Sequence, residues 1–383
     1  MLNLTQTLKT LIAFPTYAGN PVKAEDVRKL YGFVRESIPD VYESDFVSCN
    51  GHESMLIYRK GRTPEASLVL QSHVDVVPGD DELFTPKVVG DMLYGRGAFD
   101  MKFAIACYIK LLNDLADTDL NIAVWLTSDE EIGGQNGIRY LLNEKGLTCT
   151  YVYLPDGSTA NCITTSVKGV LHFELQARGN SAHGSRPWEG ENAIEKILTA
   201  YQAIKNHALF SAHHMPGNWH NTINIGMIQG GGAANQVPDF ASAQFDVRFT
   251  ESNPLGVIER IIHTIAEEHQ CVYNRLVTGS NMHIEEGNPF LNTFIQTVQN
   301  HNYPFEFTKD HGSSDARFFA EKHIPVIMFM PEGGGSHSDH EWLNLAQLEK
   351  YYQVLKDFVV TGQSKPRQKH IIVQKTGKAH QKK

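Results

Sequence analysis

The apolar run Leu68-Val69-Leu70-Gln71 leads directly into Ser72-His73-Val74-Asp75. A run of this kind predicts a buried strand, here one that ends near His73. Side chains two positions apart point to the same side of a strand, so the carboxylate of Asp75 can orient the imidazole of His73. We interpret His73 as a candidate metal ligand and Asp75 as the group that orients it. A structural histidine held by a carboxylate would give the same pattern, so the rest of the chain has to decide.

Acidic residues follow three further strand-like stretches. They are Asp100, after a glycine-rich bend at 95–97, Glu130 and Glu131, after the run 121–126, and Asp156, after the run 151–154. Helical patterns alternate with these stretches, which predicts an α/β fold with a mostly parallel sheet flanked by helices. Because ligands gather at the carboxyl ends of such strands, we expect the acids along one edge. Two other interpretations stay open, namely Asp100 as a helix N-cap and the glutamate pair as a solvated surface.

Length and composition limit the class of protein. The chain has 383 residues, too many for one ordinary core, and its 41% hydrophobic and 20% charged residues are typical of a globular protein. The net charge of -9 argues against a nucleic-acid partner. No apolar run could span a bilayer and no signal peptide is visible, so we expect no membrane partner. The five cysteines form no C-x-x-C pair, which favours a cytoplasmic protein without a thiolate zinc site.

A change of pattern at residue 167 predicts an inserted domain. From 167 to 278, four strand-like runs alternate with two helical patterns, as in a small α+β sandwich. We therefore assign 1–166 and 279–362 to one large domain and 167–278 to a small domain inserted in it. Residues 363–383 are basic and poor in apolar residues, which predicts a disordered tail. The tail could serve a weak anionic partner or be a dispensable extension.

Five motifs occur in an order that matches a known family. They are Ser72-His73-Val74-Asp75-Val76-Val77-Pro78, Gly95-Arg96-Gly97 with Asp100-Met101-Lys102, Ser128-Asp129-Glu130-Glu131-Ile132-Gly133, Gly179-Asn180-Ser181-Ala182-His183-Gly184-Ser185, and His337 with Glu341. Together they resemble the M20 metallopeptidase family, which includes succinyl-diaminopimelate desuccinylase, acetylornithine deacetylase, aminoacylase and glutamate carboxypeptidase. The resemblance implies a zinc-peptidase-like catalytic domain and makes 167–278 a ferredoxin-like lid that often pairs across a homodimer.

The resemblance also implies two zinc ions, or cobalt or manganese in their place. The implied ligands are His73 and Asp156 for one ion, Glu131 and His337 for the other, and Asp100 as the bridge between them. Oxygen and nitrogen ligands of this kind suit all three metals. Glu130 looks like the general base, Asp75 like the orienter of His73, and the peptide after Asp100 is expected to be cis.

Residues outside the metal site are implied in catalysis and substrate binding. His183, carried by the inserted domain, would complete the oxyanion pocket of a partner subunit. Asn235 and Arg248 look like ligands of the substrate carboxylate, and Arg317 is a second candidate for that role. From the residues alone, His183 could equally be a surface histidine, and Arg248 could instead pair with Asp246.

The expected activity is hydrolysis of the amide bond of a small N-acyl amino acid, as in the desuccinylases and deacetylases of the family. Paired ions polarise the scissile carbonyl and lower the pKa of a bridging water, from which Glu130 takes a proton. A dipeptidase or carboxypeptidase is the alternative, because the same groups cut either amide. A binding module that lost catalysis is the rival from another class, and the presence of Glu130 argues against it.

Desuccinylases usually have an amide side chain where this chain has Gly333, which weakens an assignment to diaminopimelate. Phe103-Ala104 replaces the usual Gly-Gly.

Overall fold

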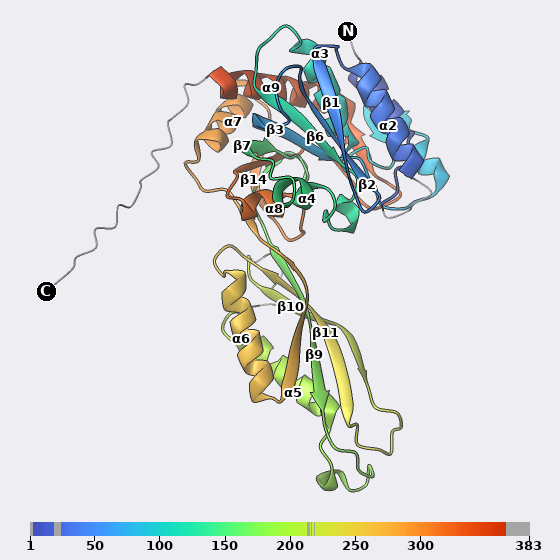
Figure 1. Cartoon of the computed structure of the whole chain (residues 1–383), viewed down its shortest axis with the longest axis vertical. Helices are drawn as coiled ribbons and strands as arrows, with labels where there is room; N and C mark the ends of the chain where they lie inside the picture. The colour runs from blue at the N-terminus through green and yellow to red at the C-terminus, as the bar shows by residue number, and fades with distance from the viewer. Residues whose placement is uncertain (1–2, 19–23, 213–214, 216, 218, 365–383) are drawn as a thin grey trace, which may run out of the picture.

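The computed structural model describes residues 3–18, 24–212, 215, 217 and 219–364. Figure 1 shows a large domain, from which the small domain projects as an elongated body. The basic tail predicted over 363–383 lies outside the described residues except for its first two positions, which are the end of the last helix.

A mixed sheet forms the centre of the large domain. In the described part of the chain it has nine strands in the order β1-β2-β6-β3-β7-β15-β8-β13, with β14 also paired to β8. Their bounds are β1 Tyr42–Cys49, β2 His52–Arg59, β3 Ala66–His73, β6 Ile122–Thr127, β7 Cys149–Tyr153, β8 Cys162–Val167, β13 Met282–His283, β14 Glu306–Asp310 and β15 Val326–Phe329. The predicted α/β class is confirmed. The central pairs β6–β3, β3–β7 and β7–β15 are parallel, whereas β1–β2, β2–β6, β15–β8 and β8–β13 are antiparallel.

The antiparallel pairing at one edge follows from a two-residue turn. Asn50 and Gly51 join β1 to β2 and have φ values of 48° and 85°. Two consecutive positive φ values are those of the type I′ turn, whose twist matches that of a hairpin. The register that pairs Cys49 with His52 is therefore set locally.

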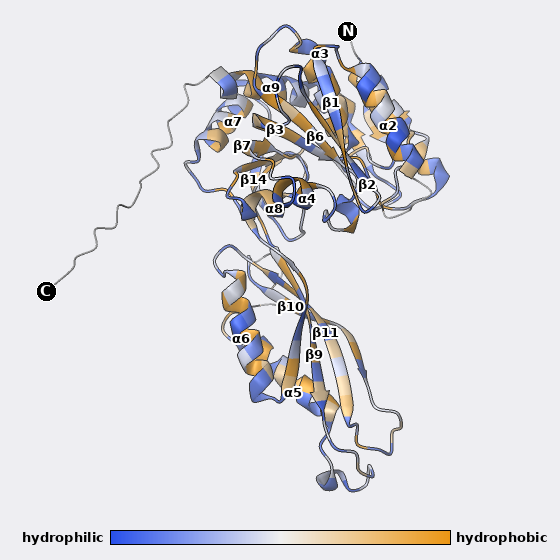
Figure 2. Cartoon of the chain, viewed as in Figure 1, coloured by the Kyte–Doolittle hydropathy of each residue, from blue (hydrophilic) through white to orange (hydrophobic). Residues whose placement is uncertain are grey.

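Helices of the large domain carry their apolar residues mainly at buried positions, and Figure 2 shows how hydrophobic and hydrophilic residues alternate along them. Their bounds are α1 Leu4–Ile12, α2 Ala24–Ser37, α3 Lys102–Asp114, α4 Ile138–Asn143, α7 Pro289–Asn300, α8 Ala316–Glu321 and α9 Leu345–Ser364. Helix α3 is buried continuously from Lys102 to Leu112 because it packs against both β3 and α1. Asp100 lies two residues before the start of this buried helix, which limits the movement of its backbone. Among the described helices, none has the length and apolar character that a membrane span requires.

A short four-stranded sheet in the described part of the large domain joins segments from both halves of the sequence. Its order is β16-β17-β5-β4, with β4 Lys87–Val89, β5 Met92–Tyr94, β16 Gly333–Gly334 and β17 Trp342–Asn344. The pairing of β17 with β5 brings the chain around His337 next to the loop that carries Asp100.

The small domain has the element order β-α-β-β-α-β. Its elements are β9 Gly169–Arg178, α5 Ala193–Asn206, β10 Thr222–Gly230, β11 Phe240–Phe249, α6 Leu255–Glu268 and β12 Cys271–Gly279. The described strands form an antiparallel sheet in the order β10-β11-β9-β12. This is the ferredoxin-like arrangement that the resemblance implies. A separate apolar cluster, which includes Phe173 stacked on Phe245 at 4.8 Å, fills its interior.

Polar and aromatic contacts join the two domains. Trp219 of the small domain donates a 2.7 Å hydrogen bond from Nε1 to Glu251. Lys309 of the large domain donates a 3.1 Å hydrogen bond to the same carboxylate. The ammonium groups of Lys309 and Lys168 lie 5.1 and 5.4 Å from the indole centroid of Trp219. These contacts fix the base of the small domain near the end of β14.

Candidate metal centre

Asp100 lies at the centre of a group of acids and histidines. One of its oxygens, Oδ1, is 3.2 Å from Nε2 of His73, and the other, Oδ2, is 3.1 Å from Nε2 of His337. The peptide bond between Asp100 and Met101 is cis. A carboxylate with one histidine at each oxygen has the arrangement of a bridging ligand.

Two sets of side chains could each hold a metal ion, and they share Asp100. The first set is His73, Asp100 and Asp156, and the second is Asp100, Glu131 and His337. In each set the ligand atoms lie within 4.8 Å of one another. His73 ends β3, and Asp156 follows the parallel neighbour β7, so both lie at the same edge of the sheet. The structure thus brings together all five ligands implied by the resemblance.

Asp75 connects the two sets through different atoms. Its main-chain carbonyl accepts a 2.9 Å hydrogen bond from Nδ1 of His73, which leaves Nε2 of that ring directed at Asp100. Its side-chain Oδ1 is farther from Nδ1, at 3.6 Å. Oδ2 accepts a 3.0 Å hydrogen bond from the main-chain nitrogen of Glu131. The side chain therefore holds the glutamate loop as well as facing the histidine that it was expected to orient.

The electrostatics of the group indicate that cations belong in it. Burial, together with Asp100 and Glu131, raises the pKa of Asp156 to about 7. Its Oδ2 is also buried without a hydrogen-bond partner among the described residues. Hydrogen bonds to Asp100 and Glu131 raise the pKa of His337 to about 10, so a proton on this ring holds the carboxylates together. A divalent ion in each set would satisfy the buried carboxylates better than protons do, and the donor set fits two such ions.

Glu130 lies close to Asp156 and His73 of the first set, precedes Glu131 of the second in the sequence, and belongs to neither set. It starts a short 3-10 turn, Glu130–Ile132, separated from the end of β6 by Ser128 and Asp129, and the turn ends at Gly133 with φ of 105°. Burial, followed by the nearby Asp156, raises its pKa well above the usual value. A non-ligating carboxyl group with a raised pKa is suited to accept and return a proton.

Residues 313–317 contact the loop that carries the two glutamates and hold it in place. Arg317 donates from one terminal nitrogen to the carbonyl of Gly133 at 2.6 Å and from the other to Ser313 at 2.7 Å. Gly134, with φ of 62°, leaves room for the buried Asp315, because a Cβ at that position would overlap its Oδ1. Both terminal nitrogens of Arg317 are thus engaged within the chain, which favours a supporting role over contact with substrate.

The remaining predicted residues belong to the small domain and lie at its two ends. Arg248 pairs with Val170 at the start of β9, next to the large domain. His183 and Asn235 belong to loops beyond the other end, where Gly184 donates a 2.7 Å hydrogen bond to the carbonyl of Asn235. Because β9 has ten residues, its ends are about 30 Å apart. Within one chain, the structure does not bring His183 and Asn235 together with Arg248.

Arg248 has an acidic partner on its own strand. Its Nε donates to Asp246 at 2.8 Å, and Nε2 of His172 lies 3.4 Å from the same carboxylate. This is the pairing that the sequence left open as the alternative to a substrate contact. A substrate carboxylate would have to compete with Asp246 for the guanidinium.

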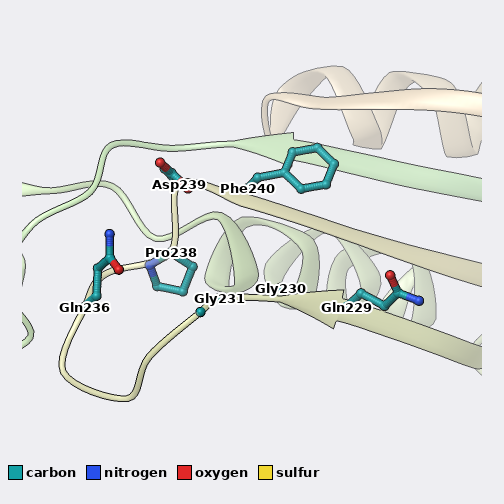
Figure 3. Close-up of a pocket in the computed structure, with 8 residues that line it drawn as sticks. Gln229, Gly230, Gly231, Gln236, Pro238, Asp239 and Phe240 are labelled. Atoms are coloured by element: carbon teal, nitrogen blue, oxygen red, sulfur yellow. The ribbon is translucent and has the colours of Figure 1, made fainter.

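A pocket of about 370 Å³ lies on the small domain, not at the metal-ligand sets. Figure 3 shows it beside the loop that connects β10 to β11, with Gln236, Pro238 and Phe240 at its wall. It is lined mainly by glycine and uncharged polar residues and has no cluster of metal ligands among those described. We assign no chemistry to it.

Sequence comparison identifies the family of the chain. A family model described as peptidase family M20/M25/M40 matches residues 69–361. The chain belongs to this family. Its members are hydrolases of amide and peptide bonds, so the chain is a metal-dependent amidohydrolase or metallopeptidase.

Curated M20 relatives of the chain are named succinyl-diaminopimelate desuccinylase. One, from Coxiella burnetii (strain Dugway 5J108-111), is 28% identical over 380 residues that cover 91% of this chain and 97% of the relative. Another, from Variovorax paradoxus (strain S110), is 28% identical over 330 residues that cover 77% of this chain and 81% of the relative. The similarity extends over both domains.

Solved structures with the same fold include peptidases. A tripeptidase from Staphylococcus aureus superposes with a TM-score of 0.72 at 18% identity and covers 94% of this chain and 98% of its own. A dinuclear metal-binding peptidase of the M20 family from Bacillus subtilis gives a TM-score of 0.67 at 18% identity, with 94% and 97% covered. At these identities the likeness shows the fold alone.

Two residues at the centre were not given a role by the sequence. Glu341 stands in the motif with His337, but its residue type alone points to no chemistry, and Asp315 belongs to none of the motifs. Both are buried carboxylates. Position in the motif is the only sequence signal for Glu341, and Asp315 has none, because the neighbours of both residues come from distant parts of the chain.

Proposed function

We propose that the protein hydrolyses the amide bond of a small N-acyl amino acid, with two zinc ions, or cobalt or manganese in their place, and Glu130 as the general base. The observation that carries the proposal is the pair of ligand sets that share Asp100, with Glu130 close to Asp156 and His73 but outside both sets. The desuccinylase names of relatives that match 91% of the chain support an acyl amino acid as substrate.

The residues of the chain divide the chemistry among them. When bound, the paired ions polarise the scissile carbonyl and make water a stronger nucleophile at neutral pH. Glu130 takes a proton from the attacking water, a new C–O bond forms, and the tetrahedral centre carries the negative charge. As the C–N bond breaks, Glu130 returns the proton to the leaving amine. The raised pKa of Glu130 suits both steps.

The small domain supports a proposed homodimer. His183 and Asn235 lie at the end of the small domain that points away from the metal ligands of their own chain. A second copy that presents this end to the metal centre would bring His183 to the oxyanion and Asn235 to the substrate carboxylate. Arg248 would then act from the same chain as the metal ligands.

Hydrolysis of a di- or tripeptide from one end is the second candidate. Gly333 cannot carry the amide side chain expected of a desuccinylase, because a Cβ there would overlap a ring carbon of Phe99 and lie 2.7 Å from the carbonyl oxygen of Trp342. The structural neighbours named as peptidases agree with this alternative. A binding module without catalysis is disfavoured by the presence of Glu130 beside a full ligand set.

A cytoplasmic location is part of the proposal. All five cysteines are free of disulfides, and four of them are buried. Free buried thiols suit a reducing compartment. A role in amino-acid metabolism follows if the substrate is an acyl amino acid.

The proposal is tested by amine release from N-succinyl-L,L-diaminopimelate, N-acetylornithine, other N-acyl amino acids and dipeptides. The protein is loaded with zinc, and a chelator-treated sample serves as the control. We expect a strong, chelator-sensitive preference for one acyl amino acid. A preference for dipeptides would favour the second candidate, and the absence of chelator-sensitive turnover on every substrate would contradict both.

A further inference from the structure

The side chain of Glu341 is the acceptor for a group of main-chain nitrogens around Asp100. Oε1 accepts hydrogen bonds of 2.8 Å from the nitrogen of Phe99 and 2.9 Å from that of Asp100 itself. Oε2 accepts a 2.9 Å hydrogen bond from the nitrogen of Gly97. The side chain is only 2% exposed. One buried carboxylate thus fixes the backbone that presents the shared ligand.

The same carboxylate belongs to the loop that carries His337. Arg96 donates from Nη1 to Oε2 of Glu341 at 3.2 Å and to the carbonyl of Ser338 at 3.0 Å. The nitrogen of Gly95 donates to the main-chain carbonyl of Glu341 at 3.1 Å. The loop from His337 to Glu341 is therefore joined to the loop before Asp100 through side chains and through backbone.

We propose that Glu341 is a positioning residue that holds the shared ligand Asp100 and the ligand His337 in register, and that it thereby sets the affinity of the ion held by Asp100, Glu131 and His337. Metal ligands have to be held within a fraction of an ångström, and the groups behind them do this. The inference rests on the proposed two-metal site. It goes beyond that site because Glu341 belongs to neither ligand set and is buried behind Asp100.

The arrangement requires a carboxylate at this position. Both oxygens of Glu341 accept from N–H donors, and neither donates. An amide in its place offers one acceptor oxygen and one NH2 group. The N–H groups that now donate to one of the two carboxylate oxygens would then face this NH2 group, which is itself a donor. Burial without an acceptor is unfavourable for those groups, and the Asp100 loop would have to shift.

The test compares Glu341→Gln with the matched control Glu259→Gln, measured with Co²⁺ and Zn²⁺. Glu259 is also largely buried and accepts hydrogen bonds from Tyr273 and Arg275, but it lies in the small domain, away from the metal ligands. Equilibrium titration gives the number of ions and their affinities, and the visible spectrum of the Co²⁺ form reports ligand geometry. We expect Glu341→Gln to bind one of the two ions about 10- to 100-fold more weakly, with an altered Co²⁺ spectrum, while the control matches the wild type.

A second variant keeps the test decisive if the first fails to fold. Glu341→Asp retains the charge, but its shorter side chain cannot reach both loops, so it should weaken the same ion selectively while circular dichroism shows a folded protein. Unchanged affinities and spectrum in either folded variant would overturn the inference, as would failure of both variants to fold, which would make Glu341 a residue of fold stability. If the wild type itself binds no pair of ions, the proposed function fails, and that result is distinct from a failure of Glu341 alone.

Discussion

The main-chain nitrogen of Glu131 donates a 3.0 Å hydrogen bond to Oδ2 of Asp75. Asp75 also accepts from His73 through its main-chain carbonyl, at 2.9 Å. One residue thus holds a ligand from each set, and His73 and Glu131 cannot move independently. Asp75 holds the segments that follow β3 and β6, and Glu341 holds the loop that carries Asp100. The two carboxylates therefore support different parts of the metal centre.

Replacement of Asp75 by asparagine should weaken the centre without unfolding the protein. The amide keeps the shape and can still accept from Glu131, but it removes the negative charge that faces Nδ1 of His73. We expect a loss of about 10- to 100-fold in metal affinity or turnover. Metal titration and kcat of the loaded variant check this, and wild-type values in both measurements would show that the carboxylate is dispensable.

Replacement of Glu130 by alanine should separate metal binding from catalysis. Glu130 belongs to neither ligand set, so both ions should bind with nearly unchanged affinity. Loss of the proton acceptor should lower kcat by about 10²- to 10⁴-fold. Elemental analysis of the purified variant and turnover on the best substrate provide the measurement. A variant that keeps its activity would show that another group is the base.

Metal binding should release protons and become tighter as the pH rises. Without metal, His337 has a pKa of about 10 and Asp156 a pKa of about 7. At neutral pH the ion bound with His337 therefore has to expel the proton from that ring, and below about pH 7 the ion bound with Asp156 also has to expel one from that carboxyl group. Affinity should rise about tenfold per pH unit for each displaced proton. Chelator competition at several pH values between 6 and 8 measures the slope, and calorimetry in two buffers of different ionisation enthalpy counts the protons. An affinity independent of pH would contradict this assignment.

The sequence contains enough information to predict the strands and the acids at their ends. His73 and Asp156 follow strands that are parallel neighbours, so an apolar run followed by a polar residue is a local signal with a direct spatial meaning. His337 could be placed only by the resemblance. It reaches the centre because β17 pairs with β5, a contact between segments about 250 residues apart.

The supporting contacts could not be predicted because they use main-chain atoms or depend on a choice between partners. Glu341 binds nitrogens that every non-proline residue has, so no residue type signals the contact. Arg248 had two possible partners, and the structure shows the one on its own strand, Asp246. The expectation of parallel strands is met at the centre of the sheet and by the pair β8–β14, whereas local turns and returning segments make the pairs β1–β2, β2–β6, β15–β8 and β8–β13 antiparallel.

Substitution of Gly134 by alanine should test the packing beneath the glutamate loop. Gly134 has φ of 62°, and a Cβ there would overlap Oδ1 of the buried Asp315. Gly51 is the matched control, because it has φ of 85° and nothing lies within 4 Å of the position that a Cβ would take. Both alanines should lower the free energy of unfolding by about 1–2 kcal/mol through left-handed strain. Only Gly134→Ala should lose about 1–3 kcal/mol more through overpacking.

Chemical denaturation of the two variants, together with turnover, distinguishes the effects. The additional loss in Gly134→Ala should be accompanied by reduced activity, because the loop that carries Glu130 and Glu131 has to shift. Equal stability and equal activity of the two alanine variants would show that Asp315 can move away at little cost.

A mixed dimer should show whether His183 acts across subunits. If each site uses Glu130 of one chain and His183 of the other, Glu130→Ala and His183→Ala homodimers are both impaired. In the hybrid, one site carries both substitutions and the other carries neither. The hybrid, isolated after co-expression with two different tags, should therefore recover about half of the wild-type activity.

The control for that experiment is a hybrid of Glu130→Ala with His337→Ala. Both of these residues act in the site of their own chain, so each site of this hybrid is defective and no activity should return. Recovery in the first hybrid and none in the second would place His183 in the partner's site. If the first hybrid also remains inactive, or if the purified wild type is a fully active monomer in light scattering, the small domain does not complete a neighbouring site and His183 is a surface histidine.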